Sequence, residues 1–341
     1  MSSEKKDTFK RLTEHKERAL RIGLDIKNDK IAFVSDSHKW DRSDVDFFNA
    51  NDPIYCEMLK QYDDAGFKLI LLGDIEEGLG DSLKEAVEHY KNTFECEKRF
   101  VREKRYFRIY GNHDHDWKNP EKRKLLSPLL GDIEVYPAVM VGDKIIAAHG
   151  HEGDLFGDEL RGFTKVILRL FRKFIDRLTG KKTSPAQNYK NRKKREEYLF
   201  EWARENHLLL ITGHTHRPMF ESYSPIYYLK KQKTLQNEAL KLPEKDHPNR
   251  AELITSIESI DAHIRFFEEN FPNDKEFIVE NLELPYYFNS GSCIFNNGIT
   301  AIEIDSGIIR LVWWKKTADG KIVADRTSFP SNNLEDILNK L

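Results

Sequence analysis

The chain has 341 residues, of which 39% are hydrophobic and 33% are charged, and its formal net charge is −2. This length favours one large or two small domains, and the composition excludes a largely disordered chain. The longest apolar runs are short, as at residues 69–72, which excludes a membrane-spanning helix. Residues 1–30 lack the apolar core of a signal peptide, and the three cysteines lie far apart without metal-type spacing. These features predict a cytoplasmic protein with reduced thiols.

The apolar pattern predicts strands that alternate with helices. Strands are expected at residues 30–35, 67–72, 105–110, 135–141, 144–148 and 208–212, followed by a closing β-series at 286–295, 298–304 and 308–314. Helices are expected at residues 7–24, 53–65, 81–100 and 253–270. We therefore divide the chain into an N-terminal helical extension (1–29), a core (30–154, 207–224 and 284–315), a basic helical cap insertion (155–206), a second helical insertion (225–283) and a C-terminal tail (316–341).

Polar residues stand where the predicted strands end. Asp74 lies 38 residues after Asp36, Asn112 lies another 38 residues on, and His149 follows 37 residues later. This spacing fits repeated strand–helix–strand units, and ligands collect at the carboxyl ends of strands in such sheets. Seven side chains should therefore meet on one rim: Asp36, His38, Asp74, Asn112, His149, His214 and His216.

This set of side chains is typical of a site for two divalent cations, which in such sites lie about 3.5–4 Å apart. Asp36, His38 and His216 are expected to hold one ion. Asn112, His149 and His214 are expected to hold the other, and Asp74 is expected to bridge the two. We expect manganese, with iron, zinc, cobalt and nickel as alternatives that the same donors accept.

The chain carries a series of short motifs in a fixed order: Asp36-Ser37-His38, Gly73-Asp74-Ile75-Glu76-Glu77, Gly111-Asn112-His113-Asp114, His149-Gly150-His151 and Gly213-His214-Thr215-His216. This series resembles the calcineurin-like metallophosphoesterase superfamily, and Asn289-Ser290-Gly291-Ser292 resembles its closing strand. The resemblance implies an α/β protein with a four-layer α/β/β/α sandwich and two helical insertions. It also implies a centre of two metal ions and hydrolysis of a phosphoester or pyrophosphate.

The resemblance further implies that His113 is the general acid and that Asp114 orients it. A hydroxide that bridges the two ions would be the nucleophile, because metal ions lower the pKa of bound water. His113 would then protonate the departing oxygen. The neighbouring Arg217 has two interpretations, a contact to a substrate phosphate or a structural salt bridge.

Residues 149–154 and the insertion before Gly213 look most similar to the UDP-2,3-diacylglucosamine hydrolase branch, which cleaves a pyrophosphate. The chain differs from that branch at His113, where the branch typically has Arg, and in its extra insertion at 225–283. Two other functions stay open. One is a nuclease or phosphodiesterase that acts on nucleic acid, and the other is a non-catalytic scaffold, in which metal-ligand residues would be missing from the sequence.

Positive charge is concentrated between Arg161 and Arg195, where 13 Lys or Arg residues accompany one acid, Asp176. Such an excess is typical of a surface that faces an anionic partner. The segment has four interpretations: a solvated helix face, a cap that attracts a phosphorylated substrate, a surface peripheral to an anionic membrane, and a contact to nucleic acid phosphates. The sequence leaves the oligomeric state open.

Overall fold

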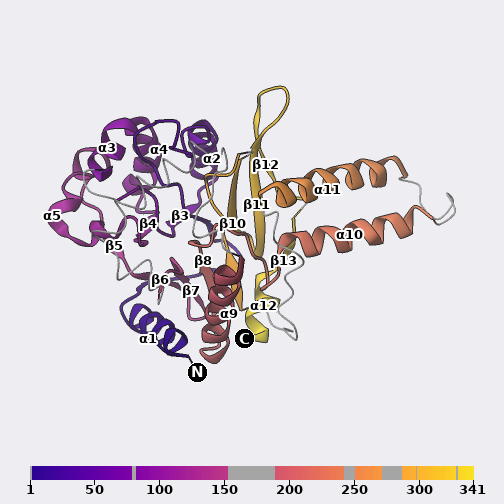
Figure 1. The fold of residues 1–341 in the computed structure, drawn as a ribbon, viewed down its shortest axis with the longest axis horizontal. Coiled ribbons are helices and arrows are strands. Elements are labelled where there is room, and N and C mark those ends of the chain that lie inside the picture. The colour runs from indigo at the N-terminus through magenta and orange to yellow at the C-terminus, as the bar shows by residue number, and fades with distance from the viewer. Residues whose placement is uncertain are drawn as a thin grey trace.

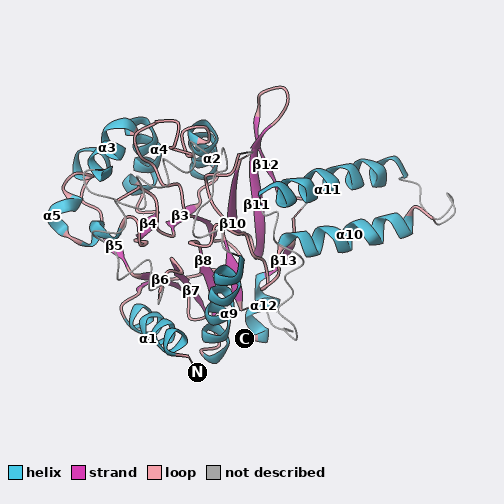
Figure 2. Ribbon diagram, in the orientation of Figure 1, coloured by secondary structure: helices cyan, strands magenta, loops and turns pink. Residues whose placement is uncertain are grey.

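In the computed structural model, the described residues are 2–78, 82–152, 189–241, 250–270, 286–296, 298–327 and 329–341. Within these ranges the chain forms two β-sheets that face each other, with helices on both outer sides (Figures 1 and 2). The strands are β1 (Leu20–Ile22), β2 (Lys30–Val34), β3 (Lys68–Leu71), β4 (Tyr106–Ile109), β5 (Val135–Tyr136), β6 (Ala138–Val141), β7 (Ile145–Ala148), β8 (Leu209–Thr212), β9 (Tyr287–Asn289), β10 (Ile299–Asp305), β11 (Ile308–Lys316), β12 (Ile322–Asp325) and β13 (Ser331–Asn333).

The longer helices are α1 (Ser3–Glu17), α2 (Asp52–Asp64), α3 (Ser82–His89), α4 (Lys91–Arg102), α9 (Tyr189–Glu205), α10 (Pro225–Ala239), α11 (Arg250–Asn270) and α12 (Leu334–Lys340). The short ones are a 3-10 turn η1 (His115–Lys118), α5 (Pro120–Arg123) and α6 (Ser127–Leu130). Sheet A has the strand order β1-β6-β7-β8-β9. Sheet B has the order β12-β11-β10-β2-β3-β4-β5, with β13 beside β11.

The strand sequences alternate between the two faces of each sheet. In β2, Ile31 and Phe33 lie in the apolar cluster between the sheets, whereas Ala32 and Val34 lie under helices α2 and α4. In sheet A, the same alternation sends every second residue of β6, β7 and β8 toward helices α1 and α9. Three apolar layers therefore separate four layers of secondary structure, and the predicted α/β/β/α sandwich is confirmed.

The parallel strands β2, β3 and β4 of sheet B end at one edge of the sandwich, as β7 and β8 of sheet A do. The loops that follow these strands carry the predicted rim residues. The hairpin predicted at Gly142-Asp143 joins β6 and β7, which pair antiparallel, and Gly142 adopts the left-handed φ of +60° that such a turn needs.

The two ends of the chain differ from expectation. The helix expected at 7–24 ends at Glu17, and β1 follows it and pairs parallel with β6. The segment expected as a tail, 316–341, contributes β12 and β13 to sheet B, and Leu334, Ile337 and Leu338 of α12 are buried. In both places a free sheet edge accepts a strand, which local sequence periodicity does not reveal.

The second insertion contains α10 and α11, which run side by side away from the sandwich (Figure 1). Lys233 Nζ lies 2.5 Å from Asp261 Oδ1, and Gln236 Nε2 donates to Ser256 Oγ at 2.9 Å. In the first insertion, residues 153–188 lie outside the described residues, and α9 packs on sheet A. None of the helices in the described ranges is both long and apolar enough to cross a membrane.

Candidate metal centre

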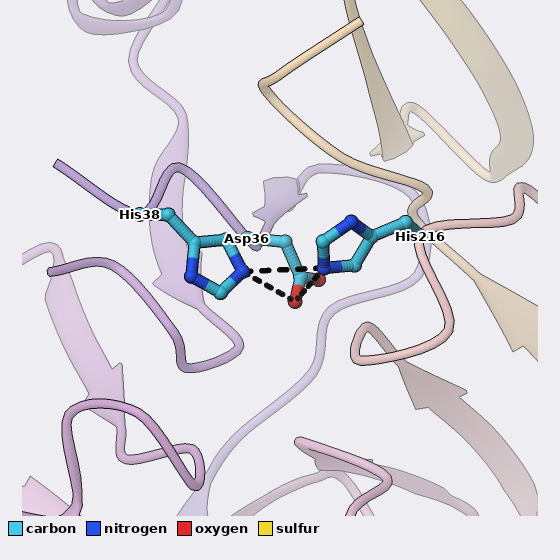
Figure 3. A group of neighbouring side chains, drawn as sticks. All are labelled: Asp36, His38 and His216. Atoms are coloured by element: carbon cyan, nitrogen blue, oxygen red, sulfur yellow. Dashed lines mark hydrogen bonds and ion pairs between the residues drawn. The ribbon is translucent and has the colours of Figure 1, made fainter. Parts of the chain in front are cut away.

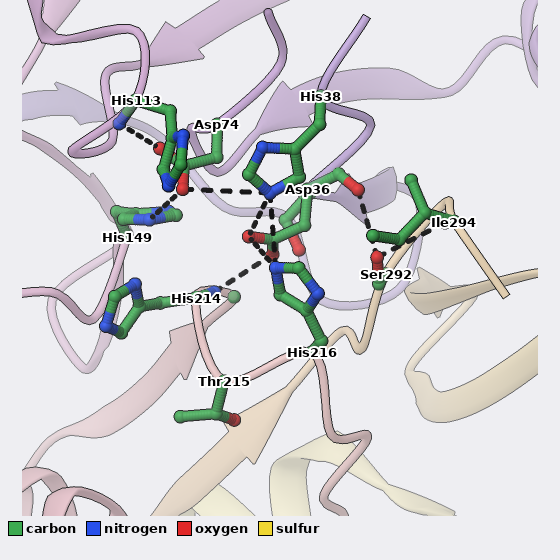
Figure 4. Close-up of polar contacts among 12 residues, drawn as sticks. Asp36, His38, Asp74, His113, His149, His214, Thr215, His216, Ser292 and Ile294 are labelled. Atoms are coloured by element: carbon green, nitrogen blue, oxygen red, sulfur yellow. Dashed lines mark hydrogen bonds and ion pairs between the residues drawn. The ribbon is translucent and has the colours of Figure 1, made fainter. Parts of the chain in front are cut away.

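The seven predicted ligands lie at strand ends on one edge of the sandwich. Figure 4 labels all of them except Asn112. Five of them have a left-handed backbone: Asp36 (φ 55°), His38 (48°), Asp74 (52°), His214 (65°) and His216 (56°). This conformation costs about 1–3 kcal/mol for a residue with a side chain, and it persists where the surrounding structure fixes it. The concentration of this strained conformation in the loops at one edge is typical of a functional site.

The first cluster consists of Asp36, His38 and His216 (Figure 3). The Nε2 atoms of His38 and His216 are 3.2 Å apart, and His216 Nε2 is 3.2 Å from Asp36 Oδ1. Asp36 Oδ1 is buried and takes part in no hydrogen bond among the described residues. Two imidazole nitrogens and a carboxylate oxygen that converge in this way fit a divalent cation.

The second cluster consists of Asp74, His149 and His214, and Asn112 adjoins it. His149 Nε2 lies 3.2 Å from Asp74 Oδ2 and 3.2 Å from Asn112 Oδ1. His149 Nδ1 donates to the carbonyl of Leu72 at 2.8 Å, which leaves Nε2 free to coordinate. Asp74 Oδ2 also lies 3.9 Å from His38 Nε2, so this carboxylate lies between the clusters, where a bridging ligand belongs.

One histidine of each cluster, His38 in the first and His149 in the second, has a raised pKa. Burial disfavours a charged His149, but the Asp74 and Asp36 carboxylates outweigh burial and raise its pKa to about 10. Likewise, burial is outweighed at His38, where Glu77, Asp74 and Asp36 raise the pKa to about 9. The pKa of Asp74 is well below its usual value despite burial, because its interactions with the neighbouring His149 and His113 favour the carboxylate. Protons and metal ions therefore compete for the same atoms.

The closing motif fixes the loop that carries two of the histidines. Asn289 Nδ2 donates to the carbonyl of Gly213 at 2.6 Å, and His214 N donates to Asp36 Oδ2 at 2.9 Å. A methyl group on Gly213 would lie 2.4 Å from Asp36 Oδ2. Only glycine therefore allows this loop to approach the first cluster so closely.

His113 lies beside the clusters, and its side chain is 31% exposed. Its Nδ1 atom is 2.8 Å from Glu77 Oε1, and its backbone N donates to Asp74 Oδ1 at 2.7 Å. The expectation that Asp114 orients His113 stays a prediction, and among the described residues no hydrogen bond joins the two side chains. Asp114 points away and accepts hydrogen bonds from Gly111 N (2.6 Å) and Ile75 N (2.9 Å).

Sequence reasoning assigned no role to Glu77, although it closes the motif that begins at Gly73. The signal was its position four residues after that glycine, on the loop that also carries Asp74. Glu77 also forms a third candidate cluster with His38 and His113, because its Oε2 atom is 3.4 Å from His38 Nδ1.

A buried ion network lies behind the rim. Lys39, Glu76, Glu97, Arg108 and Asp114 are completely buried. Lys39 pairs with Glu97 and lies 3.5 Å from Glu76 Oε1, and Arg108 pairs with Glu76 and lies 3.5 Å from Asp114 Oδ2.

Arg217 is part of the protein interior and not of the rim. Its Nη1 atom donates to Glu196 Oε2 at 2.7 Å, and both side chains are 1% exposed. Of its two interpretations, the structural salt bridge is therefore the one that the structure shows.

A sequence model of calcineurin-like phosphoesterases matches residues 29–218, which is more than half of the chain. The match contains the seven predicted ligands, His113 and Glu77. A search of curated proteins found no significant match, so the UDP-2,3-diacylglucosamine hydrolase branch stays a prediction. The fold, the paired clusters and this match lead to one conclusion: the chain belongs to the calcineurin-like phosphoesterase family, whose general activity is metal-dependent hydrolysis of phosphoester bonds.

Proposed function

We propose that the protein hydrolyses a phosphoester or pyrophosphate bond at a centre of two metal ions, with His113 as the general acid. The observation that carries the proposal is the convergence of two ligand clusters on Asp74, next to the partly exposed His113. When bound, two divalent ions supply Lewis acidity and a water-derived nucleophile near neutral pH. The mixture of carboxylate, amide and imidazole donors supports manganese first, with iron, zinc, cobalt or nickel as alternatives.

Glu77 acts as a positioning residue for the acid. Burial would favour its neutral form, but His113 and His38 hold the pKa of Glu77 well below its usual value, so it stays ionised. The carboxylate accepts a hydrogen bond from the Nδ1–H group of His113 and thereby fixes the orientation of the ring. Nε2 is then the nitrogen that can donate a proton to the departing oxygen.

The first experiment compares two chromogenic substrates, bis-(p-nitrophenyl) phosphate and p-nitrophenyl phosphate, after chelation and reloading with Mn²⁺. Faster turnover of the diester would favour a phosphodiesterase or nuclease, and faster turnover of the monoester would favour a phosphatase. The absence of metal-dependent turnover of either would leave a demanding pyrophosphate substrate or the non-catalytic scaffold.

Two variants test the assignment of the acid. His113→Ala should lower kcat by about 10²–10⁴-fold, as expected for loss of a positioned acid, and should keep its metal content. Glu77→Gln should lower kcat by about 10–100-fold at unchanged metal content, because the ring loses its anionic partner. If Glu77→Gln loses a metal ion, Glu77 is a ligand, as the third cluster permits.

The anionic partner of residues 161–195 stays a prediction, because 153–188 lie outside the described residues. Among the remaining cations of this segment, Lys194 pairs with Glu4, and Arg195 Nη1 donates to the carbonyl of Glu152 at 2.6 Å. Steep salt dependence of binding to single-stranded DNA would favour the nuclease. A need for detergent or bilayers would favour a lipid-linked pyrophosphate and a position at the membrane surface.

A further inference from the structure

Two thiols that are distant in the sequence lie side by side on the outer helices of sheet B. Cys56 belongs to α2 and Cys96 to α4, and both are partly exposed. Both thiols line the same cavity between these two helices. The spacing of the cysteines along the sequence does not reveal this pair, because the packing of α2 against α4 brings the two residues together.

The register of the two helices places the thiols opposite each other. Thr93 Oγ1 of α4 donates to Asp52 Oδ1 of α2 at 2.6 Å. Cys56 and Cys96 lie four and three residues after these positions, which is about one helical turn on each helix. On the inner side, Tyr55 OH donates to Glu97 Oε1 at 3.2 Å, so one chain neighbour of each cysteine is also paired across the helices.

The thiols open into a cavity of about 330 Å³ between the helices. Lys60 and Arg99 line it one turn beyond each cysteine, and Glu57 contributes the only acid among its lining residues. Cations near a thiol stabilise the thiolate, which is the reactive form. Cys56 Sγ donates to Asp52 Oδ1 at 3.7 Å, and an acceptor carboxylate favours the protonated thiol. The pKa of Cys56 is raised and that of Cys96 is lowered by their interaction, so Cys96 is the better nucleophile.

We propose that Cys56 and Cys96 form a dithiol site that reacts with an anionic low-molecular-weight disulfide and ends as a disulfide between α2 and α4. The Cys96 thiolate attacks one sulfur of the reagent disulfide, forms a mixed disulfide and releases one reagent thiolate. Cys56 then loses its proton and attacks the Cys96 sulfur, which releases the second reagent thiolate. One reagent disulfide is thus reduced to two thiols, while two protein thiols are oxidised to one disulfide.

The test is incubation of the metal-loaded full chain with glutathione disulfide, followed by intact mass and by thiol counting after denaturation. The expected product has lost two hydrogen atoms, carries no adduct, and retains one of the three thiols. Peptide mapping should find Cys56 joined to Cys96, and the melting temperature should rise because a loop has been closed. A persistent adduct on the wild-type chain, a dimer linked between molecules, or no reaction would overturn the proposal.

Three single variants assign the roles. Cys56→Ser should stop at the stable mixed disulfide on Cys96, because no second thiol is in reach. Cys96→Ser should form no such adduct on the same timescale, and a fast adduct on Cys56 would contradict the assigned order of attack. Cys293→Ser is the matched control: Cys293 is completely buried, so this variant should react like the wild type.

Discussion

The rim of predicted ligands and the ion network behind it both contain buried carboxylates, but different side chains offset the negative charge in each. In the network, Lys39 and Arg108 neutralise Glu76 and Glu97 inside the protein. On the rim, the ion pairs of Asp36 and Asp74 within the described residues are all with histidines. The network therefore contains one cation for each of these two glutamates, whereas the two rim carboxylates have only histidines as cationic partners.

The two regions share the same loops, because adjacent residues point in opposite directions. His38, Glu77 and His113 face the rim, and their neighbours Lys39, Glu76 and Asp114 face the network. A side chain fixed in the interior thus anchors the residue next to it. This arrangement teaches that stability and chemistry can be separated by substitution even within one dipeptide.

The largest expected effect comes from breaking the network. Arg108→Met should lower the free energy of unfolding by about 3–5 kcal/mol, because Glu76 would lose its closest cation and Lys39 alone would balance the buried carboxylates of the network. Denaturant unfolding followed by circular dichroism measures this change. The double variant Arg108→Met with Glu76→Gln should recover part of the loss, and an equal or larger loss in the double variant would contradict the charge argument.

A slightly smaller effect is expected on the rim, and on activity rather than on folding. Asp74→Asn removes the negative charge between the two clusters, so turnover should fall by more than about 100-fold. Loss of a residue that only supports a ligand costs up to about 100-fold, and Asp74 is expected to be a ligand itself. Elemental analysis of the purified variant should show fewer bound metal ions. Full metal content together with normal turnover would refute the bridging role of Asp74.

An intermediate effect is expected from a substitution at Gly111, which is not itself a predicted ligand. A methyl group on Gly111 would lie 2.1 Å from Asp74 Oδ1 and 2.6 Å from Asp74 N, so Gly111→Ala must displace this carboxylate. We expect about a 10–100-fold loss of turnover or metal affinity. Gly23→Ala is the matched control, because a methyl group there meets nothing within 4 Å, and equal activity of the two variants would contradict the steric argument.

The smallest effect is expected for an exposed ion pair. Lys84 and Glu88 lie four residues apart on α3, with a distance of 3.8 Å between Lys84 Nζ and Glu88 Oε1, and both are exposed. Lys84→Ala should change the free energy of unfolding by no more than about 0.5 kcal/mol. If Lys84→Ala lowered the free energy of unfolding as much as Arg108→Met, the difference in burial between the two ion pairs would not explain their contributions to stability.

The rim could be predicted because each candidate ligand directly follows a short apolar strand, and parallel strands bring their ends to one edge. The apolar pattern also predicted the central strands of both sheets, without β1, β12 and β13, and the helices α2 and α11. That these residues bind metal ions stays a prediction.

Features that depend on tertiary packing could not be predicted. The partner of His113 is Glu77, from another loop, rather than the adjacent Asp114. His263 of α11 is completely buried, and its Nε2 atom lies 2.8 Å from Asp325 Oδ2, a contact that no local pattern indicates. The contact between Cys56 and Cys96 likewise depends on how α2 and α4 pack, which no local pattern encodes.

The strand order of sheet B has a consequence for synthesis on the ribosome. Strand β2 pairs with β3 on one side soon after both have emerged, but its other neighbour is β10, which comes near the end of the chain. A nascent chain therefore exposes one unpaired edge of β2 for most of its translation, and such edges promote association between chains. Slow elongation before β10 should therefore reduce the yield of native protein.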